Sequence, residues 1–259
     1  MQQNNIQKTQ KNIILLTDVQ QKICHNEQIK QDIHKSKALV ELFKTIAKSP
    51  NEYTVQTFFE TYGQTRLPWA PLYILQNIVE FKQLHSASSP VVCYCQLLGN
   101  QTIKILLKNE DVRIDKLAMA ISYWIMQKTK NISIPVYNVF PLQKNVGLVE
   151  MIPMANTIYD IRKKSTILNH IMNHNPDTTT KTLRERMISS SAGACLLAFT
   201  MGLGDRHLEN ILVTQHGYLV HVDFGYVLGD DPKHVATPMR ITEDMVDALG
   251  GKNSRTFEL

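Results

Sequence analysis

The chain has 259 residues, 43% of them hydrophobic, and a formal net charge of +5 at pH 7. This length and apolar content predict a globular protein with one large domain or two lobes. The mild positive charge favours anionic partners such as nucleotide phosphates or an acidic membrane surface, but its even spread excludes a nucleic-acid-binding arm, so we expect no nucleic-acid partner.

Residues 1–60 are polar and predict a helical N-terminal extension. Apolar side chains recur there at the spacing of one helix face, at Leu39, Leu42, Phe43, Ile46 and Ala47. This pattern predicts an amphipathic helix that ends at Ser49-Pro50. The Leu-Pro-Trp-Ala-Pro sequence at 67–71 contains strong helix breakers and should separate the extension from the rest of the chain.

A β-rich segment with one helix follows, and we assign residues 61–152 to it. Residues 90–98 and 102–107 predict two strands joined at Gly99-Asn100, a favourable hairpin turn. Two more strands are predicted over 134–140 and 146–151. The intervening helix is predicted over 114–127, with an apolar stripe of Leu117, Ile121, Trp124 and Ile125.

Residues 153–259 read as a mainly helical segment. A helix over 183–200 leads into Gly202, and strands over 211–214 and 218–222 predict a hairpin around His216-Gly217. A β-rich lobe followed by a helical lobe predicts an α+β fold with the bilobal layout of protein kinases.

Cysteine usage predicts an intracellular protein. Of the four cysteines, only Cys93 and Cys95 are close in sequence, on one face of an apolar strand. No second pair completes a zinc site, so we expect reduced thiols packed as small hydrophobic side chains.

One stretch carries most of the chemistry: Gly202-Leu-Gly-Asp-Arg-His-Leu-Glu-Asn210, followed by His221-Val-Asp-Phe-Gly225. In protein kinases the catalytic Asp precedes the metal-binding Asn by five residues, and an Asp-Phe-Gly follows. Asp205 and Asn210 have this spacing here, and Asp223 begins the Asp-Phe-Gly, but the His-Arg-Asp triplet is reversed. Asn210 and Asp223 offer the oxygen ligands that Mg²⁺ prefers.

Asp205 and His207 are both candidates for activating the attacking hydroxyl group, since a histidine between an aspartate and a metal ligand can act as a general base. Arg206 is expected to be structural or to pair with a carboxylate, and His221 either to support Asp223 or to pack. A rival interpretation makes Asp205, His207, His221 and Asp223 the zinc ligands of a hydrolase, but these four residues include no His-x-x-x-His pair and no Cys.

Lys108 ends the second strand of the first hairpin. A lysine on the sheet, paired with an acid on the following helix, is what a kinase uses to hold the α- and β-phosphates of its nucleotide. Asp115 is the preferred acid, and Glu110 is the second choice.

From about residue 67 to 251 the chain resembles the phosphatidylinositol 3-/4-kinase superfamily, whose members carry Gly-x-Gly-Asp-Arg-His-x-x-Asn and Asp-Phe-Gly. The resemblance implies ATP and Mg²⁺ as cofactors, with Mn²⁺ as an alternative ion. It implies a phosphate loop at 86–90 with Ser86 and Ser88, and a Lys108-to-Asp115 phosphate-binding segment. It further implies an inner-pocket Tyr137 and a hinge whose Glu150, Met151 and Ile152 backbone meets adenine.

Residues 223–251 are similar to the activation loop of class III phosphatidylinositol 3-kinases. Lys233, His234 and Arg240 are modest positive charges there, which suit a singly phosphorylated head group. The resemblance implies a phosphoinositide substrate at a membrane surface and a cytoplasmic, peripheral location.

The chain departs from the family at two points. Lys108 and Asp115 are seven residues apart, one fewer than in the family, and only eight residues follow Gly251, where family domains continue for several helices. We therefore expect a C-terminally truncated helical lobe, with room for a protein partner to cover it.

Three hypotheses follow. The first is a lipid kinase that transfers the γ-phosphate of ATP to the 3-position of the inositol ring of phosphatidylinositol. The second is a protein Ser/Thr kinase of the same superfamily. The third is a kinase-derived binding module with weak or no catalysis.

Overall fold

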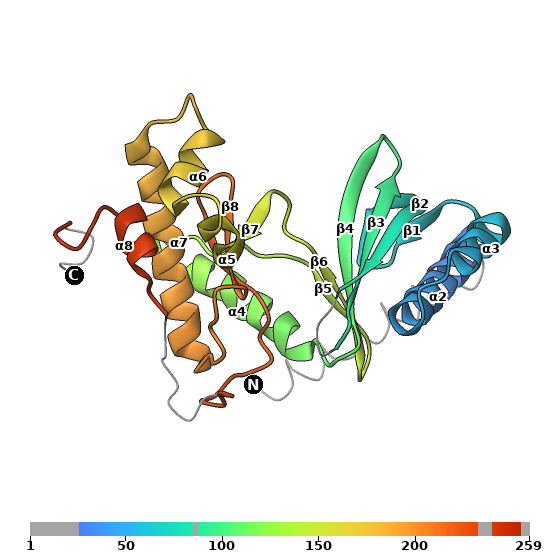
Figure 1. Cartoon of the computed structure of the whole chain (residues 1–259). Helices are drawn as coiled ribbons and strands as arrows, with labels where there is room; N and C mark the ends of the chain where they lie inside the picture. The colour runs from blue at the N-terminus through green and yellow to red at the C-terminus, as the bar shows by residue number, and fades with distance from the viewer. Residues whose placement is uncertain (1–25, 85–87, 233–239, 255–259) are drawn as a thin grey trace, which may run out of the picture. The chain divides into compact units, whose positions relative to one another are not determined.

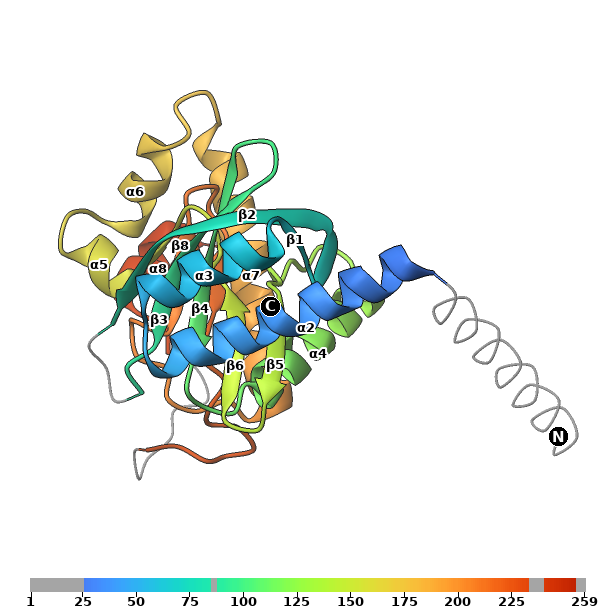
Figure 2. The ribbon, with the colours of Figure 1, turned by 90° about the vertical axis from the view of Figure 1, so that its right-hand side faces the viewer.

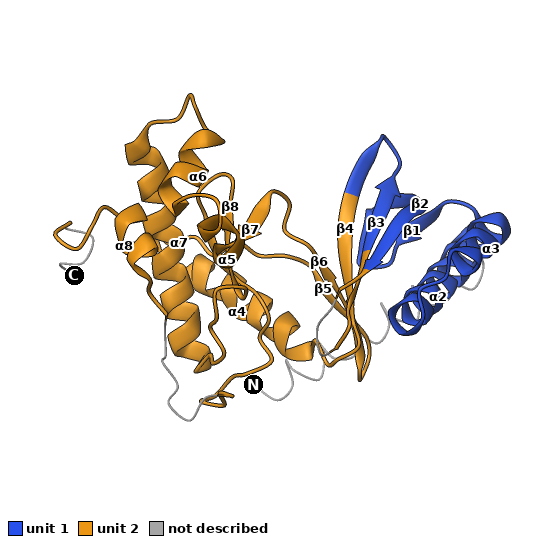
Figure 3. Cartoon of the chain, viewed as in Figure 1, with its two compact units in different colours: residues 1–82, 93–102 blue, residues 83–92, 103–259 orange. Residues whose placement is uncertain are grey.

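The computed structural model describes residues 26–84, 88–232 and 240–254. The chain forms two compact units, residues 1–82 with 93–102 and residues 83–92 with 103–259 (Figures 1 and 3). The chain passes between the units within strand β3 (Val91–Leu97) and again within strand β4 (Gln101–Lys108). None of the helices formed by the described residues combines the length and apolar character needed to cross a membrane.

The first unit begins with two capped helices, α2 (Glu27–Lys48) and α3 (Glu52–Tyr62), which lie side by side (Figure 2). The side chains of Asn26 and Asn51 accept hydrogen bonds from backbone N–H groups in the first turn of each helix, as N-cap residues do. The side chains that α2 buries are Leu39, Leu42, Phe43, Ile46 and Ala47. The predicted apolar stripe is therefore confirmed, as is the helix end before Ser49-Pro50.

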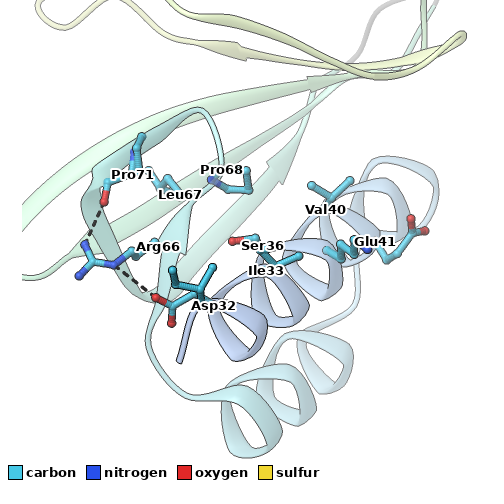
Figure 4. A pocket seen from close by; sticks show the side chains of 11 residues that line it. Asp32, Ile33, Ser36, Val40, Glu41, Arg66, Leu67, Pro68 and Pro71 are labelled. Atoms are coloured by element: carbon cyan, nitrogen blue, oxygen red, sulfur yellow. Dashed lines mark hydrogen bonds and ion pairs between the residues drawn. The ribbon is translucent and has the colours of Figure 1, made fainter. Parts of the chain in front are cut away.

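The Leu-Pro-Trp-Ala-Pro sequence forms a tight turn inside the first unit. Strand β1 (Thr65–Leu67) pairs antiparallel with β2 (Ala70–Gln83), and Leu67 lies opposite Ala70. A groove of about 460 Å³ lies between this turn and α2, and Figure 4 shows Arg66 at its edge. Arg66 donates to the carbonyl oxygen of Pro71 and pairs with Asp32 at 4.0 Å. The division into 1–60, 61–152 and 153–259 stays a prediction.

The turn between β3 and β4 contains Gly99 and Asn100, with φ of 89° and 60°. These two residue types adopt left-handed backbone at low cost, so the predicted hairpin turn sits where the sequence places it. Cys93 and Cys95 are fully buried in β3, and with Cys195 they are free thiols. The predicted packing is confirmed for Cys93 and Cys95, whereas Cys195 is only partly buried and Cys24 lies outside the described residues.

In the second unit, β4 pairs antiparallel with β6 (Val146–Glu150), which pairs with β5 (Val139–Gln143). The predicted strand over 134–140 is wrong over residues 134–138, because β5 begins only at Val139. Pro135 has no N–H to donate to a sheet. The N–H groups of Ile134 and Tyr137 point instead to the sulfur atoms of Met126 and Met119.

Helix α4 (Arg113–Lys128) confirms the predicted helix, and Ile125 of the predicted stripe is buried, but the rest of the buried face differs. Its buried residues are Asp115, Ala118, Met119, Ser122 and Ile125. Leu117 and Trp124, assigned to the buried stripe, are 50% and 61% exposed. The sequence pattern missed this face because two of its members are polar.

The remainder of the second unit is a small sheet packed with helices. Strand β8 (Ile211–Thr214) pairs with β7 (Ala155–Thr157) and with β9 (Leu219–His221), which confirms the predicted hairpin. The helices are α5 (Ile158–Arg162), α6 (Ile167–Asn173), α7 (Thr180–Met201) and α8 (Glu243–Ala248). Helix α6 lies against α7 and α8 (Figure 1), and α7 ends at Gly202, whose left-handed φ of 53° redirects the chain. The fold is thus mixed α and β, as predicted.

The buried thiols should be chemically inert in the native protein. Burial raises the pKa of Cys93 to about 12, and only the thiolate reacts with alkylating reagents. We expect the peptide containing Cys93 and Cys95 to stay unmodified by iodoacetamide at about pH 8, and to be modified fully after unfolding in guanidinium chloride, as measured by mass spectrometry. Equal modification rates before and after unfolding would contradict this packing.

Candidate active site

A cavity of about 180 Å³ in the second unit gathers most of the residues singled out from the sequence. Those that line it are Lys108, Asp115, Tyr137, Glu150, Met151, Ile152, Asn210 and Asp223. The sequence did not single out the apolar part of the wall, which consists of Leu106, Val149, Ala155, Leu212 and Val222. Strand periodicity could have predicted one of them. Leu106 and Lys108 are alternate residues of one strand, so their side chains lie on the same face of the sheet.

Lys108 is the charged centre of the cavity wall. It is 6% exposed, and its Nζ contacts the carboxylate of Glu110 and lies 3.4 Å from Oδ2 of Asp223. Burial alone would lower the pKa of Lys108, but the negative charges of Asp223, Asp115 and Glu110 outweigh it, so the pKa is raised. Lys108 therefore keeps its positive charge. The acid in contact with it is Glu110, the second choice from the sequence.

Asp115, the preferred acid, holds the Asp-Phe-Gly segment. It lies in the first turn of α4, is 3% exposed, and its Oδ1 accepts the backbone N–H of Phe224 at 3.3 Å. Burial raises the pKa of Asp115 to about 6, although the charge of Lys108 opposes the shift. Asp115 therefore links α4 to the segment that begins at Asp223.

The loop after α7 places Asp205 beside two of its predicted partners. Asp205 has a left-handed φ of 51°, and Nδ2 of Asn210 donates to its carbonyl oxygen at 3.0 Å. Nε2 of His207 lies 3.7 Å from Oδ2 of Asp205. Since the NH₂ group of Asn210 points to Asp205, its amide oxygen is left to accept or to bind a cation. Asp205 and His207 are not among the residues that line the cavity.

Arg206 fastens this loop to the Asp-Phe-Gly segment. Its guanidinium donates to the carbonyl oxygens of Gly204, Asn210, Val222 and Asp223. The side chain is 6% exposed, so these carbonyl groups replace water around a buried cation. The sequence predicted a structural role or a carboxylate partner for Arg206. The structural role holds, with backbone carbonyl groups as the partners.

His221 is buried in β9, and its Nδ1 has no hydrogen-bond partner in the described part of the chain. Burial, with a smaller effect from the charge of Arg206, lowers the pKa of His221 to about 3. The imidazole is therefore neutral near pH 7. The four side chains of the zinc alternative do not gather, because no group of three or more His, Cys, Asp or Glu among the described residues is placed to hold a metal ion.

The other predicted site residues lie elsewhere or outside the described residues. Ser88 is half-buried in the turn before β3, and Arg240 is half-buried shortly before α8; neither lines the cavity. Ser86, Lys233 and His234 lie outside the described residues.

The C-terminal part of the chain matches a known family. Residues 162–259 match the family model described as phosphatidylinositol 3- and 4-kinase. The chain is 31% identical over 204 residues to "Phosphatidylinositol 3-kinase, nodule isoform" of Glycine max, covering 74% of this chain and 25% of that protein. The chain belongs to the phosphatidylinositol 3- and 4-kinase family. This confirms the family to which the motifs pointed.

Two further relatives have similar names. Phosphatidylinositol 3-kinase VPS34 of Arabidopsis thaliana is 31% identical over 215 residues, which cover 78% of this chain and 26% of that protein. The Saccharomyces cerevisiae protein of the same name is 29% identical over 187 residues, which cover 68% and 21%. The chain thus spans about a quarter of the length of these phosphatidylinositol 3-kinase relatives.

The raised pKa of Asp115 gives a pH-dependent stability. An ordinary Asp in the unfolded chain ionises near pH 4, whereas folded Asp115 ionises near 6, so its ionisation destabilises the fold as the pH rises between these values. Asp115→Asn keeps an oxygen for the N–H of Phe224 without this cost. The quantity to measure is the difference in free energy of unfolding between Asp115→Asn and the wild type, from urea titrations. We expect this difference to increase by on the order of 2 kcal/mol as the pH rises from about 4 to 6.

The matched control is Asp111→Asn, at an exposed carboxyl group whose pKa is held at about 2 by hydrogen bonds from Arg113. A lowered pKa contributes stability that is lost as the pH falls, so this control should show no increase in the same direction. A difference for Asp115→Asn that is constant or declines with pH would refute the buried, proton-binding carboxyl group.

Proposed function

We propose that this chain is the ATP- and Mg²⁺-dependent catalytic part of a lipid kinase that phosphorylates the 3-position of the inositol ring of phosphatidylinositol. The observation that carries the proposal is the shared cavity of Lys108, Asn210 and Asp223, a protonated lysine together with two oxygen donors. The relatives named phosphatidylinositol 3-kinase support the substrate. The proposed architecture is bilobal and kinase-like, with lobes at 61–152 and 153–259 after the extension at 1–60.

The free backbone groups of the hinge support the proposed adenine site. The N–H of Glu150 donates to Asn138 and the N–H of Met151 donates to Lys104, both at 2.8 Å. The N–H of Ile152 has no partner among the described residues and belongs to the cavity wall. We therefore assign adenine recognition to Ile152. Tyr137, whose pKa burial raises well above its usual value, would remain a neutral phenol beside the base.

The phosphates and the metal ion would meet the charged wall of the cavity. Lys108 would bind phosphate oxygens, while the amide oxygen of Asn210 and the carboxylate of Asp223 would hold Mg²⁺ or Mn²⁺. The cation would neutralise charge on the phosphates during transfer. Binding of nucleotide would place phosphate oxygens where Lys108 now contacts Glu110, so this ion pair would be exchanged for a phosphate contact. In the family resemblance, Ser86 and Ser88 belong to the loop that covers the phosphates.

Asp205 and His207 would handle the nucleophile. The inositol hydroxyl oxygen attacks the γ-phosphorus, the bond from that phosphorus to the bridging oxygen of ADP breaks, and the hydroxyl proton passes to the Asp205–His207 pair. His207 is 40% exposed, so a substrate can reach it, and the carboxylate 3.7 Å away would stabilise the imidazolium ion.

Substrate recognition is assigned to the segment around Lys233, His234 and Arg240. Their positive charges would meet the phosphate of a phosphoinositide at a membrane surface, which corresponds to a cytoplasmic protein with a peripheral membrane location. A protein partner that covers the helical lobe would add a second contact beyond the lipid.

The metal-binding role of Asp223 is tested by Asp223→Ala. Without its carboxylate the site loses a Mg²⁺ ligand, so transfer of radiolabelled phosphate to phosphatidylinositol vesicles should fall by about 10³-fold or more. Chromatography of the product would identify the phosphorylated ring position. The thermal unfolding curve should change little, because the Asp223 side chain is 45% exposed.

A parallel assay with a general protein substrate distinguishes a lipid kinase from a protein kinase. A measurement of Mg²⁺-ATP binding distinguishes both kinases from a binding module with weak or no catalysis. Exposed Asp230→Ala is the matched control and should retain full activity. Unchanged lipid phosphorylation by Asp223→Ala would overturn the assignment of Asp223.

A further inference from the structure

The segment after the Asp-Phe-Gly runs alongside the loop that carries Asp205. The backbone N–H of Leu228 donates to the carbonyl oxygen of Met201 at 2.7 Å, and the N–H of Gly229 donates to that of Gly202 at 3.0 Å. In the opposite direction, the N–H of Gly204 donates to the carbonyl oxygen of Tyr226 at 3.0 Å. We call residues 226–231 the strap, and the loop that carries Asp205 the catalytic loop. Each of the two segments donates backbone hydrogen bonds to the other.

The last contact of the strap is made by a side chain. Oδ2 of Asp231 accepts the backbone N–H of Asp205 at 2.9 Å. The carbonyl oxygen of the same residue accepts Nδ2 of Asn210 at 3.0 Å. Both backbone polar groups of Asp205 thus have partners. Its N–H bonds to the strap, and its carbonyl oxygen accepts from Asn210, a proposed metal ligand, and from the backbone N–H of His207 at 3.1 Å. These bonds hold its left-handed backbone.

Gly204 makes this approach possible because it has no side chain. A Cβ atom there would lie 2.3 Å from the carbonyl oxygen of Asp230 and 2.9 Å from Oδ2 of Asp231. The φ of Gly204 lies outside the left-handed range, so its backbone conformation is open to any residue. The glycine is therefore needed for space: it lets the strap come close enough for the Asp231 carboxylate to reach Asp205.

We propose that Asp231 is a positioning residue for Asp205, and that it couples the strap to the catalytic loop. The proposal rests on the proposed kinase function, in which Asp205 acts on the attacking hydroxyl. A non-glycine residue in the left-handed region needs contacts that fix it, and a charged acceptor on its N–H is a strong one. Loss of this acceptor lets the Asp205 peptide rotate, which moves the carboxylate relative to His207.

The first test compares Asp231→Ala, Asp231→Asn and Asp230→Ala. Asp230 is an adjacent, exposed aspartate whose described contacts to the loop use its backbone only. We expect Asp231→Ala to lower kcat for phosphatidylinositol by about 10- to 100-fold, because small misplacements of a catalytic group have effects of this size. The KM for ATP should stay within about 2-fold, because Asp231 does not line the nucleotide cavity. Asp231→Asn keeps an oxygen acceptor and should recover most of the activity, and Asp230→Ala should match the wild type.

The second test adds Gly204→Ala, which pushes the strap away from the loop without changing Asp231. We expect its loss of kcat to resemble that of Asp231→Ala and the double variant to be no worse than either, since both changes break one contact. Losses that multiply in the double variant, or a kcat for Asp231→Ala equal to that of Asp230→Ala, would overturn the proposal. The proposal would also be overturned if kcat and the melting temperature both decreased in Asp231→Asn as well as in Asp231→Ala.

Hydrogen–deuterium exchange separates this proposal from the kinase assignment. The backbone amide of Asp205 should exchange faster in Asp231→Ala than in the wild type or Asp230→Ala, whichever substrate the protein uses. If the amide exchanges faster in Asp231→Ala but the wild type does not phosphorylate phosphatidylinositol, the lipid substrate is refuted and the contact between Asp231 and Asp205 still stands. Unchanged exchange in an active enzyme would refute the positioning role and retain the function.

Discussion

A buried guanidinium is the interaction on which the site depends. Arg206 donates to backbone carbonyl oxygens on both sides of the β8–β9 hairpin. The acceptors before the hairpin belong to Gly204 and Asn210, and those after it belong to Val222 and Asp223. A buried cation is costly unless hydrogen bonds replace its hydration, and a planar group with five donors suits several carbonyl groups at once. Without the guanidinium, these carbonyl groups would lose their charged donor, although the oxygen of Asn210 would keep the backbone N–H of Val222 at 3.1 Å. One cation therefore fixes the separation of Asn210 and Asp223.

The charges of the cavity wall explain why a divalent cation suits the site. Lys108 is the positive group, and Glu110, Asp115 and Asp223 are the carboxyl groups that act on it. Three carboxyl groups beside one lysine are an excess of acidic groups, whereas the raised pKa of Asp115 itself comes mainly from burial. A Mg²⁺ ion would relieve this excess, and nucleotide phosphates would then bring their own negative charge to Lys108. Cation and nucleotide binding should thus favour each other.

Local patterns predicted what depends on neighbours in sequence. The Leu39–Ala47 stripe, the Gly99-Asn100 turn and the 211–222 hairpin follow from helical spacing and turn chemistry, and the structure contains all three. The buried face of α4 did not follow, because a hydrophobic pattern cannot rank Asp115 above Trp124 for burial. The contacts of Arg206 and Asp231 also lay beyond the sequence, since both depend on segments that approach only in the folded chain. The motif, the lysine–acid pattern and the family resemblance together nevertheless identified eight of the residues that line the cavity.

The shortened Lys108–Asp115 connection, one departure from the family pattern, still delivers its acid to the cavity. Lys108 pairs across the sheet with Gly147, and a Cβ atom at Gly147 would lie 2.0 Å from a methyl carbon of Val112. Val112, the N-cap residue of α4, therefore occupies the space that the glycine leaves beside the lysine. This packing fixes the start of α4 over β6, and a helix that begins there presents Asp115 within its first turn. A side chain at position 147 would clash with Val112, so the glycine is what lets the helix start this close to the sheet.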